Sequence, residues 1–567
     1  PCNIYGDNHA AEAKPGEFPL LTKDHHEVAF CAPLWEFRAD RAAMPFAALC
    51  WDGGVAAAAV EPYSESEAGI IRNGVFAALP DAFGISLGYT NDPTTFKNRS
   101  TAAPSTRGMA RKAQTSGRIS LGSGPRPELH EISRQEYARH QDRAVPRNTL
   151  RQAVQGMLDT FAYQNFDAAA GEYTNRCCRP PRETEMRPWR LVTEIGWTGG
   201  GVLAYPLVLC RDALGADAEA PLAAAMSGEQ LFDRIADAYN ENSGLLNDLM
   251  APNAAGSQVN GWWTGYGLVK DCHCAYTVGS AVHYLTKTMD YLHQNGKPCP
   301  AKWMDAAQKV LHTVMDLQRA DGAFGYTYST QERKVLDWSG FAGCWFAPAL
   351  VYLYRLTGEE RCLHSAEKAL DYYHTFVKDL NCYGTPMDTW KAVDEEGNLA
   401  FMRGSRLLYE QTGKAEFLQY MKDSAGYEFL WRYGYKTYPE HTPLNQGWSA
   451  CGGAVTSVSN PHIHPMGVII DTDLRYLARV TGDGYYASRA ADSAAWMLQC
   501  LELYPAATGY GRYGILSERW CPSDGLDVER FSDGRPFSSW FSHNLWASAC
   551  VLEAACELLL ESEHKKG

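Results

Sequence analysis

The sequence lacks an excess of positive charge and any long apolar run. Its 52 Lys and Arg residues are outnumbered by 66 Asp and Glu residues, which gives a formal net charge of −14. So acidic a chain presents no general surface for nucleic acid. No apolar run approaches the roughly 20 residues that a membrane helix requires. We therefore expect neither a nucleic-acid partner nor a membrane partner, and homo-oligomerisation is left open.

A paired-cysteine framework is also missing. The 17 cysteines are odd in number and scattered, without repeated CxxC pairs. This usage favours a reducing compartment and predicts a cytoplasmic protein, while the start at Pro1 leaves a removed leader open. Cys272-His273-Cys274 and Cys177-Cys178 could ligate a soft metal, but no ligand quartet accompanies them. We predict no metal site and no cofactor, since buried or incidental thiols explain these cysteines better.

The order of patterns along the 567 residues predicts two domains. Short apolar runs broken by Asp-Gly-Gly and Asn-Gly turns fill the first 90 residues, which is typical of strands. A polar segment near 91–127, rich in Ser, Thr, Gly, Pro, Arg and Lys, indicates a linker. We expect a β-rich, sandwich-like domain over residues 1–131 and a helical domain over residues 132–567.

Three similar turns organise the helical part. Thr-Gly follows an apolar helical stretch at Thr357, Thr412 and Thr481, and another helix begins directly afterwards. A glycine at a helix C-terminus adopts the left-handed conformation at low cost, so the chain can reverse there. The repeated turn therefore predicts a series of helical hairpins.

Extending this pattern gives six hairpins. The first helices are predicted near 146–164, 226–241, 303–320, 361–378, 415–432 and 484–502, and the second near 197–212, 274–293, 342–356, 399–411, 466–480 and 541–560. The second helices are more apolar, which is typical of buried helices. The prediction is a mainly α fold, an (α/α)6 toroid with the second helices inside. The links within hairpins are long, and all must emerge at the N-termini of the inner helices, where we expect the functional face.

Two stretches carry a resemblance to a known family. They are "LQRADGAFGY" over 317–326 and "SSWFSHNLWASACVLEAACELL" over 538–559. With the order of the hairpins, they make the chain similar to the six-hairpin glycosidase superfamily with an N-terminal β-sandwich. The resemblance implies a carbohydrate-active enzyme, because this architecture includes glycosidases, unsaturated-uronide hydrolases, phosphorylases and lyases. Sugar epimerases share the barrel.

Glycoside cleavage usually requires two carboxyl groups that flank the bond. In the third link, Asp337 precedes Trp338, which could desolvate the carboxyl group or stack on a sugar. A helix N-cap is the alternative interpretation of Asp337. In the sixth link, Glu518, Arg519 and Trp520 place an acid, a cation and an aromatic ring side by side. A surface ion pair is the alternative there.

The fourth link offers a further catalytic candidate. Asp388 lies close to Trp390, whereas Asp394, Glu395 and Glu396 fit better as the solvated start of a helix, where negative charge suits the dipole.

The first, second and fifth links hold candidates for substrate binding. They are Glu194 and Trp197 in the first link, Trp262, Trp263 and Asp271 in the second, and His462 and His464 in the fifth. The paired tryptophans suit either a stacking platform or a hydrophobic plug in the loop. The two histidines could bind a metal, but a proton-transferring or substrate-contacting His464 is the stronger hypothesis.

The leading hypothesis is a glycoside hydrolase that acts on an oligosaccharide by two-carboxylate acid/base catalysis, with Glu518 and Asp337 as the preferred pair. Frequent Arg and Lys residues in the links suggest a uronic-acid-containing substrate. One rival is a polysaccharide lyase with His464, Asn460 and Tyr513 as its central residues. Another is a glycan-binding protein without catalysis.

Overall fold

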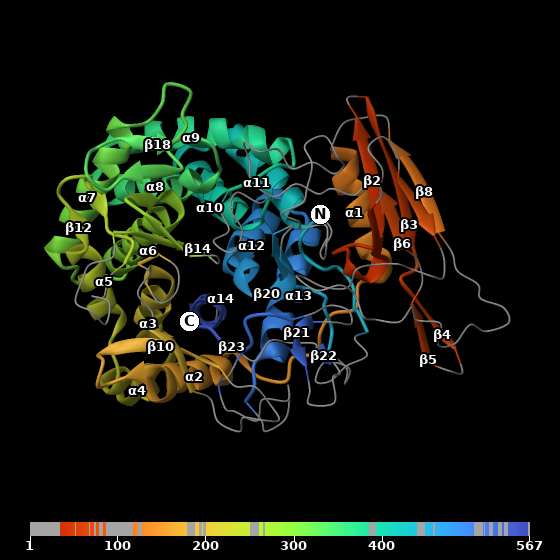
Figure 1. The fold of residues 1–567 in the computed structure, drawn as a ribbon, viewed down its shortest axis with the longest axis horizontal. Coiled ribbons are helices and arrows are strands. Elements are labelled where there is room, and N and C mark those ends of the chain that lie inside the picture. Colours follow the sequence, from red (N-terminus) through yellow and green to blue (C-terminus); the bar gives the residue numbers. More distant parts are fainter. Residues whose placement is uncertain are drawn as a thin grey trace.

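The computed structural model describes most of residues 35–564, as a strand-rich part on one side and a larger helical part (Figure 1). The residues that it leaves undescribed are 1–34, 52, 67–68, 73–74, 79–82, 87–116, 123–126, 178–186, 192–194, 197–199, 250–259, 265–266, 385–392, 439–447, 458–459, 504–513, 515, 521–525, 531–535, 538–541 and 565–567. None of the described helices is long and apolar enough to cross a bilayer.

Two small antiparallel sheets and a hairpin make up the N-terminal part. The first sheet holds β1 (Trp35–Arg38), β6 (Val75–Ala78) and β7 (Phe83–Ser86). The second sheet holds β2 (Phe46–Trp51), β3 (Gly54–Val60) and β8 (Gly117–Gly122). The hairpin consists of β4 (Tyr63–Ser66) and β5 (Gly69–Arg72). Val60 and Phe76 belong to one small buried cluster that joins the two sheets. The sandwich-like arrangement expected from the apolar runs is therefore present.

The helix α1 (Pro127–His140) connects this part to the barrel. Leu129 and Ile132 of α1 pack against Val55 and Ala57 of β3. The boundary expected at 131/132 falls inside α1. The linker expected near 91–127 also contains β8, which pairs with β3 along its whole length.

Twelve helices of the described chain form six hairpins. The outer helices are α2 (Leu150–Thr160), α5 (Gly228–Asp237), α7 (Ala301–Asp316), α9 (Glu360–Lys378), α11 (Ala415–Glu428) and α13 (Gly484–Cys500). The inner helices are α3 (Gly201–Leu214), α6 (Ala275–Gln294), α8 (Phe346–Thr357), α10 (Glu396–Thr412), α12 (Asp471–Thr481) and α14 (Leu545–His564). Each inner helix contacts the next, and α14 contacts α3, so the ring is closed. The predicted (α/α)6 toroid is confirmed.

Short helical segments complete the helical part. They are the π-helix η2 (Phe161–Asn165), the 3-10 helices η3 (Gly215–Ala218), η4 (Ala342–Trp345) and η5 (Met466–Ile470), and the short helix α4 (Glu219–Ala224). The segments η4 and η5 lead directly into the inner helices α8 and α12, so they bring the third and fifth links down to the ring.

The three Thr-Gly turns share one set of hydrogen bonds. Gly358, Gly413 and Gly482 have φ values of 73°, 65° and 70°, so each caps its helix in the left-handed conformation. The hydroxyl group of the preceding threonine donates to the carbonyl four residues back and accepts from the N–H two residues ahead. The glycine permits the reversal and the threonine fixes it, which explains why the chain repeats the pair.

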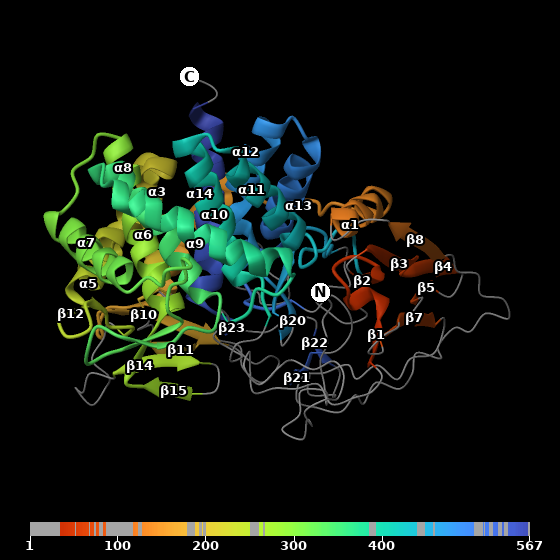
Figure 2. The same ribbon diagram turned by 90° about the horizontal axis from the view of Figure 1, so that it is seen from above.

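Short strands occupy five of the long links. The first link holds β9 (Phe166–Asp167), β10 (Glu172–Cys177) and β11 (Arg187–Leu191), and the second link region holds β12 (Tyr239–Asn240), β13 (Leu245–Leu246), β14 (Gly261–Thr264), β15 (Gly267–Lys270) and β16 (Cys272–Cys274). The third link holds β17 (Thr327–Ser329) and β18 (Val335–Asp337), and the fifth holds β19 (Ala454–Ser457) and β20 (Asn460–His464). The sixth link holds β21 (Leu526–Arg530), β22 (Pro536–Phe537) and β23 (Ser542–His543). Figure 2 shows β10, β11, β14, β15, β20, β21, β22 and β23 along one rim of the barrel, while the C-terminal end of α14 projects from the other.

Candidate active site at the rim of the barrel

The six long links form a closed circuit at this rim. Backbone pairing or a backbone hydrogen bond joins Ile195 to Asp248, Cys272 to Ser329, Phe341 to Tyr383, Glu395 to Thr456, Ile463 to Trp520, and His543 to Arg176. Each of these contacts joins one link to the next, and the last joins the sixth link to the first. The expected gathering of the links at a single face is therefore observed. Residues from distant parts of the sequence meet there on a rigid scaffold.

The third link brings Asp337 and Trp338 to the rim. Asp337 ends β18, and its Oδ1 accepts hydrogen bonds from the backbone N–H of Ser339 at 2.8 Å and from the Ser339 hydroxyl at 2.7 Å. The guanidinium of Arg319 lies 5.2 Å from the centre of the Trp338 ring. Both side chains are half-buried. Asp337 therefore stabilises a local turn and does not cap a helix, so the N-cap alternative was wrong, and the side chain remains partly open to solvent.

The sixth link brings Glu518 and Arg519 to the same rim. Glu518 is only 5% exposed, and its Oε2 accepts a hydrogen bond from Nδ2 of Asn544, which directly precedes α14. Nε of Arg519 lies 3.7 Å from the same oxygen. The surface ion pair considered from the sequence does not describe this buried arrangement, because the carboxylate is held against the start of an inner helix.

Two tryptophans expected to bind substrate belong to the core. Trp262 is 1% exposed and Trp520 is 0% exposed. The ring of Trp520 stacks on Trp448 with the ring centres 6.2 Å apart, and its backbone pairs with that of Ile463. Neither ring presents a face to a ligand in this structure. Trp262 thus fits the hydrophobic plug that was the alternative for the second link, and Trp520 is a core residue of the sixth link.

His464 and Asp271 have contrasting surroundings. His464 is buried, and its ring stacks on Trp546 with the ring centres 5.9 Å apart. Asp271 is exposed and adopts a φ of 60°, in the left-handed region that aspartate tolerates better than most residues. Its Oδ1 accepts a hydrogen bond of 3.4 Å from the Asn260 side chain. Asp271 therefore lies in a surface turn at the edge of the rim.

Five other sequence-based candidates lie wholly or partly outside the described residues. Asp388, Glu194 and Trp197 are among the undescribed residues, and so are the side chains of Trp263 and His462. The backbone of Trp263 lies in β14 and that of His462 lies in β20, both at the rim. These five residues stay predictions.

The acidic run Asp394-Glu395-Glu396 was expected to be solvated, and this interpretation was wrong. The three residues are 0%, 0% and 6% exposed at the start of α10. Oδ1 of Asp394 accepts from the backbone N–H of Gly397 and caps the helix. Burial, followed by the charge of Glu396, raises the pKa of Tyr276 on α6 well above its usual value. Glu396 thus lies beside a tyrosine of another inner helix, at the mouth of the barrel.

A buried acid cluster supports the start of α10. Glu428 accepts two hydrogen bonds from Arg432, at 3.0 and 2.7 Å, and Asp471 accepts a third at 2.8 Å. Burial raises the pKa of Glu395 well above its usual value, and the neighbouring Glu428 raises it further. Burial likewise raises the pKa of Asp471 to about 7. One arginine therefore faces three carboxyl groups, which favours the protonated form of Glu395.

This acid cluster requires a glycine beside it. A Cβ on Gly467 would lie 2.4 Å from Oε1 of Glu395 and 3.2 Å from Oε1 of Glu428. Only glycine therefore leaves room for both carboxyl groups at this point. The backbone oxygen of Gly467 also accepts a hydrogen bond of 2.7 Å from Arg432, which ties the cluster to η5.

Three buried side chains, of Asp248, His273 and Ser243, are linked by hydrogen bonds in the arrangement of a catalytic triad. Nδ1 of His273 lies 2.8 Å from Asp248, and Nε2 lies 2.9 Å from the hydroxyl oxygen of Ser243. All three side chains are at most 2% exposed. Asp248 also accepts from the backbone N–H of Cys274, the residue before α6. Because the hydroxyl group is enclosed, this group holds the second link in place.

Metal-binding groups are not found in the described part of the chain. No set of three or more His, Cys, Asp or Glu residues there is arranged to hold a metal ion. The described thiols of the Cys272-His273-Cys274 run are buried, and burial raises the pKa of Cys272 to about 11.

Comparisons with known proteins give a distant likeness in fold. No family model matches the sequence, and no curated protein matches it. A glycoside hydrolase family 76 mannosidase from Bacteroides thetaiotaomicron is 15% identical, with 73% of this chain and 99% of that chain covered and a TM-score of 0.46. An unsaturated glucuronyl hydrolase specific for heparin is 13% identical, with coverage of 74% and 98% and a TM-score of 0.44. A cellobiose 2-epimerase from Spirochaeta thermophila is 12% identical, with coverage of 78% and 98% and a TM-score of 0.47.

The architecture itself defines the fold. Six helical hairpins in a closed ring, with their long links joined at one rim, form the (α/α)6 barrel that the resemblance to the six-hairpin glycosidase superfamily implied. A small sandwich-like domain precedes the barrel, again as that resemblance implied.

Proposed function

We propose that this protein is a glycoside hydrolase that acts on an oligosaccharide at the rim of the barrel. The observation that carries the proposal is the placement of Asp337 and Glu518. They lie in the third and sixth links, which lead into the third and sixth inner helices, α8 and α14. In the closed ring of six inner helices, α8 and α14 are opposite each other, so the two links approach the rim from opposite sides. Carboxyl groups on both sides of a bond are what glycoside cleavage requires.

The hydrogen bonds of the two carboxyl groups suggest their roles. Glu518, whose Oε2 accepts a hydrogen bond from the amide of Asn544, is assigned as the general base that activates water. The contacts with Ser339 fix Oδ1 of Asp337, and Asp337 is assigned as the general acid that protonates the leaving oxygen through Oδ2. Glu396, beside Tyr276, is a third carboxyl group at the mouth of the barrel.

Arg519 supports an acidic sugar as the narrower substrate. Its side chain is 17% exposed, and its Nε lies 3.7 Å from Oε2 of Glu518. A planar guanidinium at this position can pair with a substrate carboxylate through two hydrogen bonds. A uronic-acid residue next to the cleaved bond is therefore the proposed substrate class, and Arg519 is the residue that would recognise it.

The test is hydrolysis of neutral and uronate-containing oligosaccharides by the full chain. We expect new reducing ends without the ultraviolet absorbance of an unsaturated product. E518Q and D337N should each lower kcat by about 10²–10⁴-fold, which is the usual contribution of a general acid or base. E332Q, which changes an exposed acid in the same link as Asp337, is the matched control and should retain full activity. Unsaturated products would favour the lyase hypothesis, and full activity of E518Q would refute the assigned pair.

A further inference from the structure

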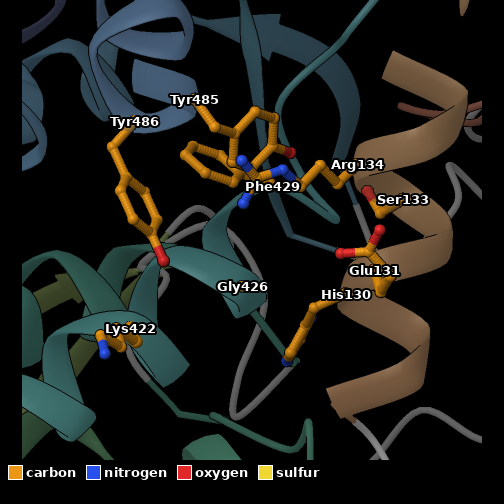
Figure 3. A pocket seen from close by; sticks show the side chains of 9 residues that line it. All are labelled: His130, Glu131, Ser133, Arg134, Lys422, Gly426, Phe429, Tyr485 and Tyr486. Atoms are coloured by element: carbon orange, nitrogen blue, oxygen red, sulfur yellow. The ribbon is translucent and has the colours of Figure 1, made fainter. Parts of the chain in front are cut away.

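A pocket outside the barrel lies between α1 and the outer helices α11 and α13. It has a volume of about 170 Å³. Figure 3 shows the side chains of α1 on one side and those of α11 and α13 on the other. The lining residues are His130, Glu131, Ser133, Arg134, Lys422, Gly426, Phe429, Tyr485 and Tyr486. None of these lining residues belongs to the links that hold the acids proposed to be catalytic.

Two contacts, one helical turn apart, hold α1 against the barrel. At one, the ring of His130 lies so close to α11 that a Cβ on Gly426 would be 2.6 Å from it. At the other, Arg134 donates two hydrogen bonds to Asp483, at 2.7 and 2.8 Å. Residues 130 and 134 lie on the same face of α1. The space between these contacts therefore belongs to the docked arrangement and does not depend on a loop.

Two hydroxyl groups at the pocket have no partner among the described residues. They are the hydroxyl groups of Ser133, which is 2% exposed, and of Tyr485. Buried polar groups are nearly always hydrogen-bonded, so these two call for a partner that enters the pocket. A hydroxyl group both donates and accepts, and it therefore suits a ligand that carries hydroxyl groups itself.

The remaining lining restricts the chemistry of that ligand. Phe429 and Tyr486 are stacked, with ring centres 6.4 Å apart at 30°, and they supply an apolar wall. Glu131 would repel a simple anion, and Lys422 would repel a simple cation. The ligand should therefore be neutral, with an apolar face and several hydroxyl groups. A pyranose ring meets these requirements, and pockets for small molecules commonly combine aromatic walls with a few polar groups.

We propose that this pocket is a second carbohydrate site, which holds one neutral sugar residue against Tyr486 with hydrogen bonds to Glu131 and Ser133. A bound sugar would bridge α1 to the barrel, so an oligosaccharide could be retained on the protein away from the site of cleavage. The ligand class follows the proposed function, but no residue is shared with the proposed catalytic pair.

The test is calorimetric titration of the full chain with D-glucose, D-galactose, D-mannose and D-glucuronate. In the background of E518Q, which leaves this pocket intact, we expect millimolar binding of at least one neutral sugar and weaker binding of glucuronate. Y486A should weaken that binding at least tenfold. E131Q and S133A keep the helix contacts and should each weaken it severalfold, which covers the case in which Y486A does not fold. Y163A, which removes an exposed aromatic ring elsewhere, should have no effect.

The outcomes separate this inference from the proposed function. Binding that is equally strong in Y486A, E131Q and S133A, or no binding of any neutral sugar, would overturn the second site. Hydrolysis of oligosaccharides by the wild-type chain would stand in either case. Conversely, sugar binding that depends on Tyr486 in a chain without hydrolytic activity would support the second site and refute the proposed enzyme.

Discussion

The two ends of the barrel use the same six inner helices in opposite ways. At the rim, long links meet and carboxyl groups outnumber the cations that face them, as around Arg432. At the far end, Thr-Gly turns connect hairpins, and a cavity of about 390 Å³ is lined by residues from all six inner helices. Its lining cations are Lys287, Arg355, Arg403 and Arg406, and each is paired with a carboxylate.

This difference shows that a cavity alone does not mark a site. At the far end, burial lowers the pKa of Lys287, but the carboxylates of Glu553 and Glu557 more than offset this, so its pKa is raised. The charges there satisfy one another and serve the fold. At the rim, burial and the excess of carboxyl groups around Arg432 raise the pKa of Glu395 and of Asp471. We therefore expect substitutions at the far end to change stability, and substitutions of the proposed catalytic acids at the rim to change chemistry.

The largest expected effect tests the far end. K287M leaves Glu553 and Glu557 buried without their cation, which should lower the free energy of unfolding by about 3–5 kcal/mol. Urea-induced unfolding measures this change, and kcat of the folded fraction should be unchanged. The double variant K287M/E553Q should recover part of the loss. A large fall in kcat at full stability would place chemistry at the far end and reverse the comparison.

The next effect tests the excess of acid at the rim. Folded Asp471, with its pKa of about 7, holds a proton that the unfolded chain releases near 3.8. Raising the pH from 4 to 7 should therefore lower the free energy of unfolding, by up to roughly 4 kcal/mol from this group. D471N lacks this contribution, so its stability relative to the wild-type chain should rise across that interval. The free energies of unfolding of D471N and the wild-type chain can be measured in urea from pH 4 to pH 8. A constant difference between them over this interval would contradict a buried, protonated Asp471.

A smaller effect tests the enclosed Ser243. S243A leaves Nε2 of His273 without its partner, which should cost about 1–3 kcal/mol of stability. Turnover of an oligosaccharide by the folded variant should be unchanged, because the hydroxyl group is held inside the second link. Loss of turnover at wild-type stability would mean that this group, and not the acids of the rim, carries the reaction.

The sequence predicted the ring better than it predicted the site. The hairpins follow from helical periodicity and from Thr-Gly turns, which act within a few residues and are therefore legible in the sequence. Whether a loop residue is buried depends on neighbours far away in the chain. Trp520 is enclosed by Trp448 and Ile463, and Glu396 meets Tyr276, although no local pattern indicates these partners. The one available signal for Glu396 was its position at the end of a long link, directly before an inner helix.

The smallest effect tests why the turns of the far end use glycine. Gly413 and Gly484 both have open space where a Cβ would lie, but only Gly413 has a positive φ, of 65°. G413A should therefore lower the free energy of unfolding by about 1–2 kcal/mol through backbone strain alone. G484A, at the start of α13, should be neutral or stabilising by about 0.5–1 kcal/mol. Equal stabilities of the two variants in urea would mean that backbone conformation does not set the far-end turns, and neither variant should alter turnover at the rim.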